Sequence, residues 1–173
     1  MPAHYETHRA QIEAILRAWG MPAAHAARTA EVMGWADLHG VDSHGLSMLT
    51  VYDERRRAGR LDMRAEPSVL TETPVSALID GGGGLGHVPA RFAMETAITK
   101  ARQSGMAVSA VRNSAHFGAT GYYTNMAAEA GLIGMAATSA AGVQVAPTFG
   151  AEAKLGTDPW SFAAPGRPGE PFL

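Results

Sequence analysis

The fold prediction depends on the stretch Asp80-Gly81-Gly82-Gly83-Gly84-Leu85-Gly86-His87. This stretch has two interpretations, and only one of them predicts a Rossmann fold. It matches Gly-x-Gly-x-x-Gly at Gly81, Gly83 and Gly86, and an apolar run at residues 77–79 precedes it. In a Rossmann fold this pattern forms the turn that binds a pyrophosphate, with a strand before it and a helix directly after it. Alternatively, the glycines form a connection in which the chain passes close to another backbone segment.

Two features favour the second interpretation. A Rossmann site needs an acidic residue about twenty positions further on, which binds the ribose hydroxyls, but the next predicted strand ends in Arg112 and Asn113. Arg112 would suit a 2′-phosphate, so the binding of NADP stays open. Pro89 predicts a helix that begins three residues beyond Gly86, too far for the glycines to build its first turn. A P-loop is disfavoured as well, because no Lys-Ser/Thr pair follows.

The first sixty residues have the spacing of helices that bury one face. The helices are predicted over residues 12–19, 22–39 and 43–59, and a glycine closes each of them. The second helix is expected to bury Ala26, Thr29, Val32, Met33 and Ala36. Three short helices of this kind predict a small helical subdomain.

From about residue 68, strands and helices alternate. Strands are predicted at residues 68–71, 75–79, 107–111, 133–138 and 160–163, and helices at residues 90–104 and 122–130. This order predicts an α/β layer after the helical subdomain. The chain ends on Pro171-Phe172-Leu173, after a predicted loop at residues 165–170 and where a strand begins, which predicts a fragment of a longer protein.

The composition is that of a globular protein of one domain or two small ones. Of the 173 residues, 46% are hydrophobic and 17% are charged, which is too apolar for a disordered chain. The net charge is −2 and no basic stripe occurs, so we expect no nucleic-acid partner. Arg55-Arg56-Arg57, beside Asp53 and Glu54, predicts only a solvated helix face.

The absence of cysteine and the absence of long apolar segments restrict the class of protein further. Without cysteine, the chain has no disulfide framework and no thiolate metal site. It also has no signal-type apolar segment and no apolar run of about 18 residues, so we expect a cytoplasmic protein that does not contact a membrane.

Four of the seven histidines lie at the ends of predicted elements, where ligands usually bind: His39, His44, His87 and His116. The other three, His4, His8 and His25, are predicted to be surface residues. A metal site formed by His44, His87 and His116 is a disfavoured alternative, because no His-x-His or His-Glu-x-x-His spacing occurs. We therefore expect no metal.

The stretch Asp42-Ser43-His44-Gly45 lies at the start of the third predicted helix. Asp42 or Ser43 suits the N-cap, which places His44 in the first helical turn. There the helix macrodipole disfavours the imidazolium and lowers its pKa, so His44 suits proton exchange with a carbonyl or alcohol oxygen. The alternative is a helix cap with a space-filling histidine. A hydrolase with Ser43 as nucleophile is disfavoured, because adjacent helix residues point about 100° apart and do not hydrogen-bond.

A second polar cluster occupies residues 113–123. It follows the strand predicted at residues 107–111, at the edge where ligands of α/β sheets gather. Groups that can bind a phosphate or an amide come from Asn113, Ser114, His116 and Thr120. Tyr122 and Tyr123 are equally consistent with the edge of the core.

Four motifs together resemble the type-2 malate/L-lactate dehydrogenase family. They are LHGVDSHG at 38–45, GGLGH at 83–87, RNSAHFGATGYY at 112–123 and LGTDP at 155–159, in the order of the family. The family includes ureidoglycolate, sulfolactate and diketogulonate dehydrogenases and Δ1-piperideine-2-carboxylate reductase. The resemblance implies an α/β (α+β) fold that is not a Rossmann fold: a helical subdomain at residues 1–62, then a mixed-sheet nucleotide domain with flanking helices at residues 63–173. It also implies a homodimer.

The resemblance implies a reaction and its residues. Hydride would pass between NAD or NADP and C2 of a 2-hydroxy or 2-oxo acid, or of a related imine. Ser43 and His44 match the family's Ser-His pair, in which His44 exchanges the proton, and His116 competes for that role. The cofactor is expected along His116, Phe117, Gly118, Ala119 and Thr120. Tyr52, Met48 and Thr157 match positions near the substrate.

Two residues depart from the family pattern. Many members have an arginine clamp for the substrate carboxylate where this chain has Met48, which predicts a larger or less charged substrate unless another cation replaces it. The family's Gly-Thr-Asn-Pro is Gly-Thr-Asp-Pro here, which changes the donors at Asp158. Family members are about twice as long, so the chain is predicted to be the N-terminal half of such an enzyme. The alternative is a non-catalytic fragment that needs a complementary chain.

Overall fold

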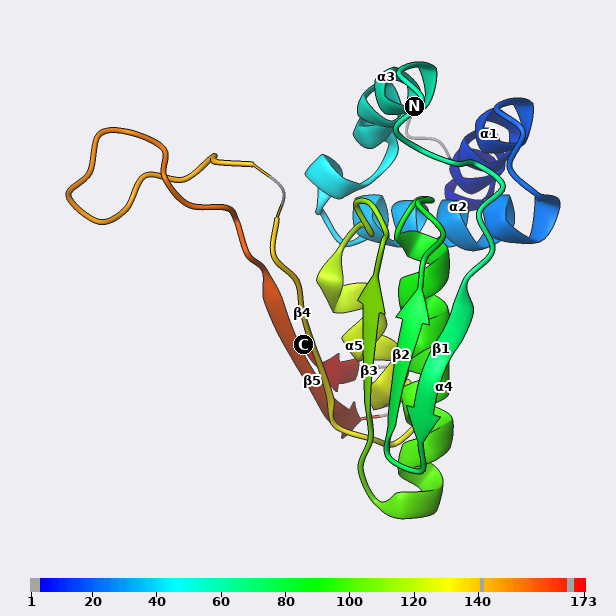
Figure 1. Cartoon of the computed structure of the whole chain (residues 1–173), viewed down its shortest axis with the longest axis vertical. Coiled ribbons are helices and arrows are strands. Elements are labelled where there is room, and N and C mark those ends of the chain that lie inside the picture. Colours follow the sequence, from blue (N-terminus) through cyan, green and yellow to red (C-terminus); the bar gives the residue numbers. More distant parts are fainter. Residues whose placement is uncertain (1–3, 141, 168–169) are drawn as a thin grey trace.

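The computed structural model describes residues 4–140, 142–167 and 170–173. A group of helices lies across one end of a β-sheet, and a second sheet stands beside the first (Figure 1). The helices are α1 (Tyr5–Ala18), α2 (Ala23–Leu38), α3 (Leu49–Arg57), α4 (His87–Ser104) and α5 (Thr120–Glu129), with 3₁₀ turns η1 (Asp42–His44) and η2 (Leu46–Met48). The strands are β1 (Ser68–Thr73), β2 (Ser76–Asp80), β3 (Val108–Arg112), β4 (Gly134–Ala137), β5 (Trp160–Arg167) and β6 (Glu170–Phe172). No helix in these ranges is long and apolar enough to cross a membrane.

The first two helices pack largely through the faces that their spacing predicts, although Ile15, which shares the spacing of the buried face of α1, is 36% exposed. Ile12 and Leu16 of α1 are fully buried, as are all five residues expected to face inward from α2. Gly20, with φ +93°, ends α1 as predicted. Tyr52 of α3 and Leu85 of the glycine stretch complete the same core. The helical part and the glycine stretch are therefore packed together.

The five predicted strands all occur, and together with β6 they form two sheets of three strands each. β1 pairs antiparallel with β2, β2 pairs parallel with β3, and α4 is the crossover between the parallel strands. β4, β5 and β6 pair antiparallel, and α5 packs against β5. Parallel and antiparallel pairs in one sheet confirm the mixed α/β class.

The predicted loop at residues 165–170 is largely wrong. β5 continues to Arg167 and β6 begins at Glu170, so four of these six residues belong to strands. Pro168 and Gly169 lie outside the described residues.

The glycine stretch joins β2 directly to α4, contrary to the expectation from Pro89, because α4 begins at His87. Five of its N–H groups donate hydrogen bonds within the chain: Gly81 to Arg112 O, Gly82 to Asp80 Oδ1, Gly83 to Asn113 O, Gly84 to Gly81 O and Gly86 to His116 O. These groups are therefore unavailable to a phosphate. A Cβ at Gly86 would lie 2.4 Å from the Ala115 carbonyl oxygen, so close backbone packing requires this glycine. The second interpretation of the stretch is confirmed.

The third predicted helix is wrong in its first part. Instead of one helix from Ser43, the chain forms η1 and η2, and α3 begins only at Leu49. The cause is a tertiary contact: the Asp37 carboxylate of α2 accepts the Leu46 N–H at 2.9 Å. A Cβ at Gly45 would lie 1.8 Å from Asp37 Oδ1, so only glycine lets the two segments meet.

Two histidines predicted on the surface are partly or fully covered. His8 Nε2 lies 2.6 Å from Asp37 Oδ2 in a half-buried pair between α1 and α2. His25 is only 8% exposed, and its Nε2 lies 3.3 Å from Glu66 Oε2. His4 is exposed, as expected. Sequence spacing on one helix does not show these contacts, because their partners come from other segments.

A polar network links the helical part to the α/β part. The Tyr122 hydroxyl of α5 donates to Glu31 of α2 at 2.8 Å and accepts from Arg91 of α4 at 2.9 Å. Arg91 also pairs with Glu31 at 2.5 Å. Tyr122 and Tyr123 are buried, so the core-edge interpretation of these tyrosines is the one that the structure supports.

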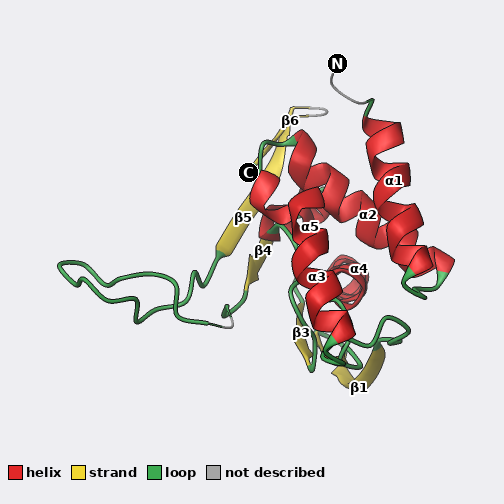
Figure 2. Ribbon diagram, turned by 90° about the horizontal axis from the view of Figure 1, so that it is seen from above, coloured by secondary structure: helices red, strands yellow, loops and turns green. Residues whose placement is uncertain are grey.

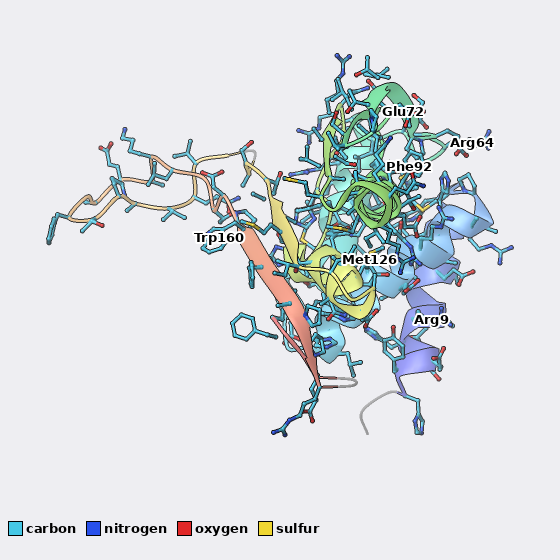
Figure 3. The ribbon with its side chains drawn as sticks, turned by 90° about the horizontal axis from the view of Figure 1, so that it is seen from below. Arg9, Arg64, Glu72, Phe92, Met126 and Trp160 are labelled. Carbon is cyan, nitrogen blue, oxygen red and sulfur yellow. The ribbon has the colours of Figure 1, made fainter. Side chains whose placement is uncertain are left out.

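The segment between β4 and β5 forms a long arm that extends away from the rest of the chain (Figures 1 and 2). Within it, Val145 and Leu155 form a bridge, and Asp158 Oδ1 accepts the Ala140 N–H at 2.8 Å. Phe149 near its tip is fully exposed. Trp160, where the arm returns to β5, is 72% exposed (Figure 3).

Candidate active site

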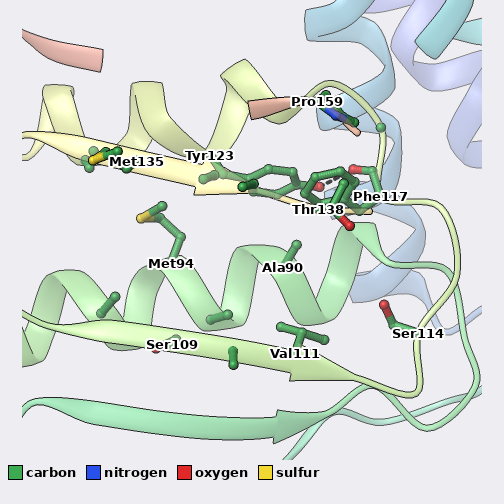
Figure 4. A pocket seen from close by; sticks show the side chains of 18 of the residues that line it. Ala90, Met94, Ser109, Val111, Ser114, Phe117, Tyr123, Met135, Thr138 and Pro159 are labelled. Atoms are coloured by element: carbon green, nitrogen blue, oxygen red, sulfur yellow. Dashed lines mark hydrogen bonds between the residues drawn. The ribbon is translucent and has the colours of Figure 1, made fainter. Parts of the chain in front are cut away.

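A cleft of about 1540 Å³ runs between the α4–β3 layer and the α5–β4 layer. Figure 4 shows Ala90 and Met94 of α4 and Val111 of β3 on one wall, with Met135 of β4 opposite. At one end, the residues that line it come from the turns before α3 and from the loop after β3. They include Ser43, His44, Met48 and His116.

The ring of His44 is positioned by a hydrogen bond to the adjacent residue, Ser43, and the two residues lie in a 3₁₀ turn rather than in an α-helix. The Ser43 hydroxyl lies 2.8 Å from His44 Nδ1, so the prediction that these side chains cannot hydrogen-bond is wrong. The prediction assumed α-helical geometry, whereas both residues belong to the short turn η1. The pKa of His44 is lowered as expected, but the cause is burial and not the dipole of an α-helix. Ser43 and His44 are thus brought together at the cleft.

His116 lies opposite His44, with 5.2 Å between the ring centroids. Its Nδ1 lies 2.6 Å from the Tyr52 hydroxyl, and the Gly118 N–H points to the same atom at 3.4 Å. Burial raises the pKa of Tyr52, so its hydroxyl keeps its proton and donates. Nδ1 therefore accepts, and the ring proton of neutral His116 is on Nε2.

The surroundings of His116 keep it uncharged. Burial first, and then the charges of His44 and Arg55, lower its pKa to about 4. Near neutral pH, His116 is therefore a neutral ring with one N–H group to offer.

His87 lies behind this pair and is fully buried. Its ring packs edge-on to Tyr52 at 5.7 Å and to His116 at 6.4 Å between centroids. Neither ring nitrogen has a hydrogen-bond partner among the described residues. Burial lowers its pKa to about 3, with smaller contributions from His116 and His44. Its place at an element end was predicted, but not its burial.

The structure brings together only part of the predicted cofactor segment. His116, Phe117 and Gly118 line the cleft, and Phe117 stacks on Tyr123 with centroids 5.1 Å apart. Ala119 and Thr120 are buried at the start of α5 and do not line it. Gly118, with φ +80°, makes room for His87, because a Cβ there would lie 2.9 Å from His87 Nε2.

The predicted substrate residues separate into two groups. Met48 and Thr157 line the cleft, Met48 from η2 and Thr157 from the arm. Tyr52 is fully buried behind His116 and does not line it. At the histidine end, Val51 and Arg55 also line the cleft, and neither had a predicted role there. Their helical spacing from Met48 is the signal that could have found them.

No metal site is found in the part of the chain that the structure describes. No group of three or more His, Asp or Glu side chains there is arranged to hold an ion. His44, His87 and His116 lie near one another, but His87 is buried away from the cleft.

A mixed α/β fold with two histidines at one end of a long cleft has the features of an enzyme domain that binds a small molecule. Comparison with known proteins identifies the family. The chain belongs to the malate/L-lactate dehydrogenase family, whose sequence profile matches residues 3–173. The family resemblance predicted from the four motifs is confirmed.

Individual relatives agree with this assignment. The malate dehydrogenase of Pyrococcus abyssi is 42% identical over 159 residues, which are 92% of this chain and 43% of that protein. The ureidoglycolate dehydrogenase (NAD(+)) of Escherichia coli K12 is 38% identical over 162 residues, 94% of this chain and 46% of that protein. The crystal structure of malate dehydrogenase from Entamoeba histolytica matches with a TM-score of 0.92 and 37% identity, covering 99% of this chain and 47% of that one. The chain thus spans about half the length of these relatives.

Proposed function

We propose that this chain is part of an NAD(P)-dependent oxidoreductase that transfers hydride between the nicotinamide and C2 of a 2-hydroxy or 2-oxo acid, or of a related imine. The observation that carries the proposal is the His44–His116 pair, with ring centroids 5.2 Å apart, at one end of a cleft in a member of this family. A substrate oxygen placed between the two rings would meet a proton-exchanging group and a fixed N–H donor.

The cleft fits a nicotinamide dinucleotide. Its volume of about 1540 Å³ exceeds the usual range of roughly 300–1,000 Å³ for small-molecule sites, and alanines such as Ala90 and Ala110 leave room on one wall. When bound, the cofactor supplies or accepts the hydride. We expect the nicotinamide end near Phe117 and Gly118. Arg112, which would meet a 2′-phosphate, pairs with Asp80 at 3.2 Å, and this supports NAD over NADP.

The two histidines are proposed to have different roles. His116 donates its Nε2–H to the substrate oxygen, because Tyr52 and Gly118 occupy its Nδ1. His44 exchanges the proton. Its Nδ1 is hydrogen-bonded to Ser43, whereas its Nε2 has no partner among the described residues and is free to meet the substrate. The low pKa of His44 makes it a base that is ready to accept the alcohol proton during oxidation.

The test uses the full-length protein. Fluorescence titration with NADH and NADPH is followed by absorbance assays on 2-oxo acids and cyclic imines. His44→Ala is expected to lower kcat by roughly 10²–10⁴-fold and to leave the NADH affinity unchanged, whereas the exposed control His4→Ala changes neither. If His116→Ala gives the His44 result instead, the two roles are reversed. No binding of either nucleotide would rule out the whole proposal.

A second candidate is a non-catalytic fragment that needs a complementary chain. The observation that favours it is that the chain spans about half the length of its relatives. The DNA downstream of the codon for Leu173 discriminates the two: a continuing reading frame supports the enzyme, and a stop codon without a complementary gene supports the fragment.

We further infer that residues 1–62 and 63–173 are a helical subdomain and a nucleotide domain, and that the whole protein is a cytoplasmic homodimer. The support for this is the family resemblance. Light scattering of the full-length protein measures the oligomeric state, and a mass of one protomer would contradict the inference.

A further inference from the structure

Arg55 differs from the two arginines that follow it. Asp53 pairs with Arg56 Nη2 at 2.5 Å and with Arg57 Nε at 2.7 Å. Arg56 also lies over the Trp19 ring, 5.2 Å from its centroid. Within the described ranges, the Arg55 side chain has no carboxylate within 4.0 Å and no hydrogen bond. The run of three arginines is therefore not one solvated face: two members have local partners, and Arg55 does not.

Arg55 faces the cleft. It is partly buried and lines the cleft together with Met48 and Val51. Spacings of three and four residues place these side chains on one face of the helix. His44 and His116 line the same cleft, and the Arg55 charge contributes to the low pKa of His116 after burial and His44. The guanidinium therefore lies within electrostatic range of the reacting pair.

Arg55 and Met48 both line the cleft, from opposite ends of one helical stretch. Position 55 comes seven positions after position 48, which corresponds to roughly 10 Å along a helix axis. A carboxylate bound by Arg55 would therefore lie several bonds away from one bound at position 48, where this chain has Met48. A carboxylate is a strong ligand for a partly buried guanidinium that has no counterion. It neutralises the charge and can accept two parallel hydrogen bonds from the planar guanidinium group.

We propose that Arg55 determines specificity by binding a second, distal carboxylate of the substrate, so that the enzyme prefers 2-oxo acids with an anionic group at the far end. This inference rests on the proposed function, since it assumes that the reaction centre lies at the two histidines.

The test compares two kinds of substrate in the full-length enzyme with NADH. Oxaloacetate and 2-oxoglutarate have a distal carboxylate, and 2-oxobutyrate has none. Arg55→Met is expected to raise the KM for both dicarboxylates by roughly 10–100-fold with a small change in kcat, while the monocarboxylate 2-oxobutyrate keeps its KM within about threefold. Arg55→Lys should give an intermediate effect, because it keeps the charge and loses the fork.

Arg57→Met is the matched control, because Arg57 lies on the same helix, is exposed and pairs with Asp53. It should leave all three KM values unchanged. Thermal melting shows whether the Arg55→Met variant is folded. If that variant is unfolded, the same comparison of substrates is made with Arg55→Lys. Equal effects of Arg55→Met on both kinds of substrate, or no effect on either, would overturn the inference alone. A parent enzyme that reduces no 2-oxo acid or imine overturns the proposed function, and the inference with it.

Discussion

Burial keeps two histidines uncharged, His116 at one end of the cleft and His87 behind it. The pKa of His116 is about 4 and that of His87 about 3, and burial is the main cause for both. In the unfolded chain both return to about 6.5. Between these values the unfolded state binds more protons than the folded state, so the free energy of unfolding falls as the pH is lowered from 6.5 towards 4.

His87→Leu is therefore expected to make stability less sensitive to acid. At neutral pH the substitution should be nearly neutral, because it removes two buried polar atoms that have no partner among the described residues. Between pH 7.5 and 4.5 the parent protein should lose roughly 2–3 kcal/mol more than the variant. Urea denaturation at both pH values measures this, with exposed His4→Gln as control. Equal losses in parent and variant would contradict the low pKa of His87.

Tyr52 fixes the ring of His116, and Tyr52→Phe removes only the hydroxyl that does so. Without this donor, His116 can carry its proton on Nδ1, and the N–H that we assign to the substrate is lost in a fraction of the molecules. We expect kcat/KM to fall roughly 10–100-fold and stability to fall by about 1 kcal/mol. Steady-state kinetics and thermal melting measure the two effects. Tyr5→Phe on α1 is the control, and an unchanged kcat/KM in Tyr52→Phe would exclude the positioning role.

At the scale of elements, the turns before α3 depend on one carboxylate. Asp37 accepts from Leu46 N–H and pairs with His8, so α1, α2 and the turns η1 and η2 meet at this side chain. Gly45→Ala would place a methyl group 1.8 Å from Asp37 Oδ1 and displace the segment that holds His44.

We expect Gly45→Ala to cost about 1–3 kcal/mol of stability, as overpacking does, and also to lower kcat through His44. Thermal melting and steady-state kinetics of the full-length enzyme measure the two effects. Gly59→Ala is the control: its Cβ would meet nothing within 4 Å, so it costs only the strain of its φ of +68° and should leave kcat unchanged. A Gly45→Ala enzyme with normal kcat would show that Asp37 does not position His44.

The elements that the sequence predicted well are those with local causes. The faces of α1 and α2, the strands and the glycine stops follow from spacing and backbone freedom, which act within a few residues. The errors at Ser43, His25 and Arg55 have another origin. Each of these residues depends on a distant segment. Asp37 of α2 fixes the turns that contain Ser43, and Glu66 lies beside His25. Arg55 lines a cleft that is formed by other elements. From the residues alone, His44 and His116 were predicted only as parts of two separate motifs, and the family resemblance is what implied that both belong to one site.

At the scale of the whole molecule, the cleft lies between two unpaired strand edges. Within the described residues, β3 and β4 each end a sheet and have one hydrogen-bonded neighbour. Val108 of β3 and Met135 of β4 are 65% and 68% exposed. Free apolar edges pair readily with other chains.

The 173-residue chain, expressed alone, should therefore form assemblies larger than a dimer as its concentration rises. A Val108→Lys, Met135→Lys variant should resist this, because charged residues on edge strands oppose pairing. Light scattering over a concentration series measures both proteins. Ser139→Lys, on the exposed arm, is the control for added charge. An unmodified chain that stays monomeric throughout would show that these edges are protected.

The hydrogen bonds of the glycine stretch have a consequence for how this family evolves. Five N–H groups of this stretch donate hydrogen bonds, Gly81, Gly84 and Gly86 have no room for a Cβ, and Gly82 and Gly83 have positive φ, so substitution of any of these five glycines would disturb the fold itself. A descendant that had lost all enzymatic activity would keep the same glycines as long as it stayed folded. Their retention in a divergent gene is therefore a sign of a surviving architecture, whereas a sign of surviving chemistry has to be sought at the two histidines that we propose to react, His44 and His116.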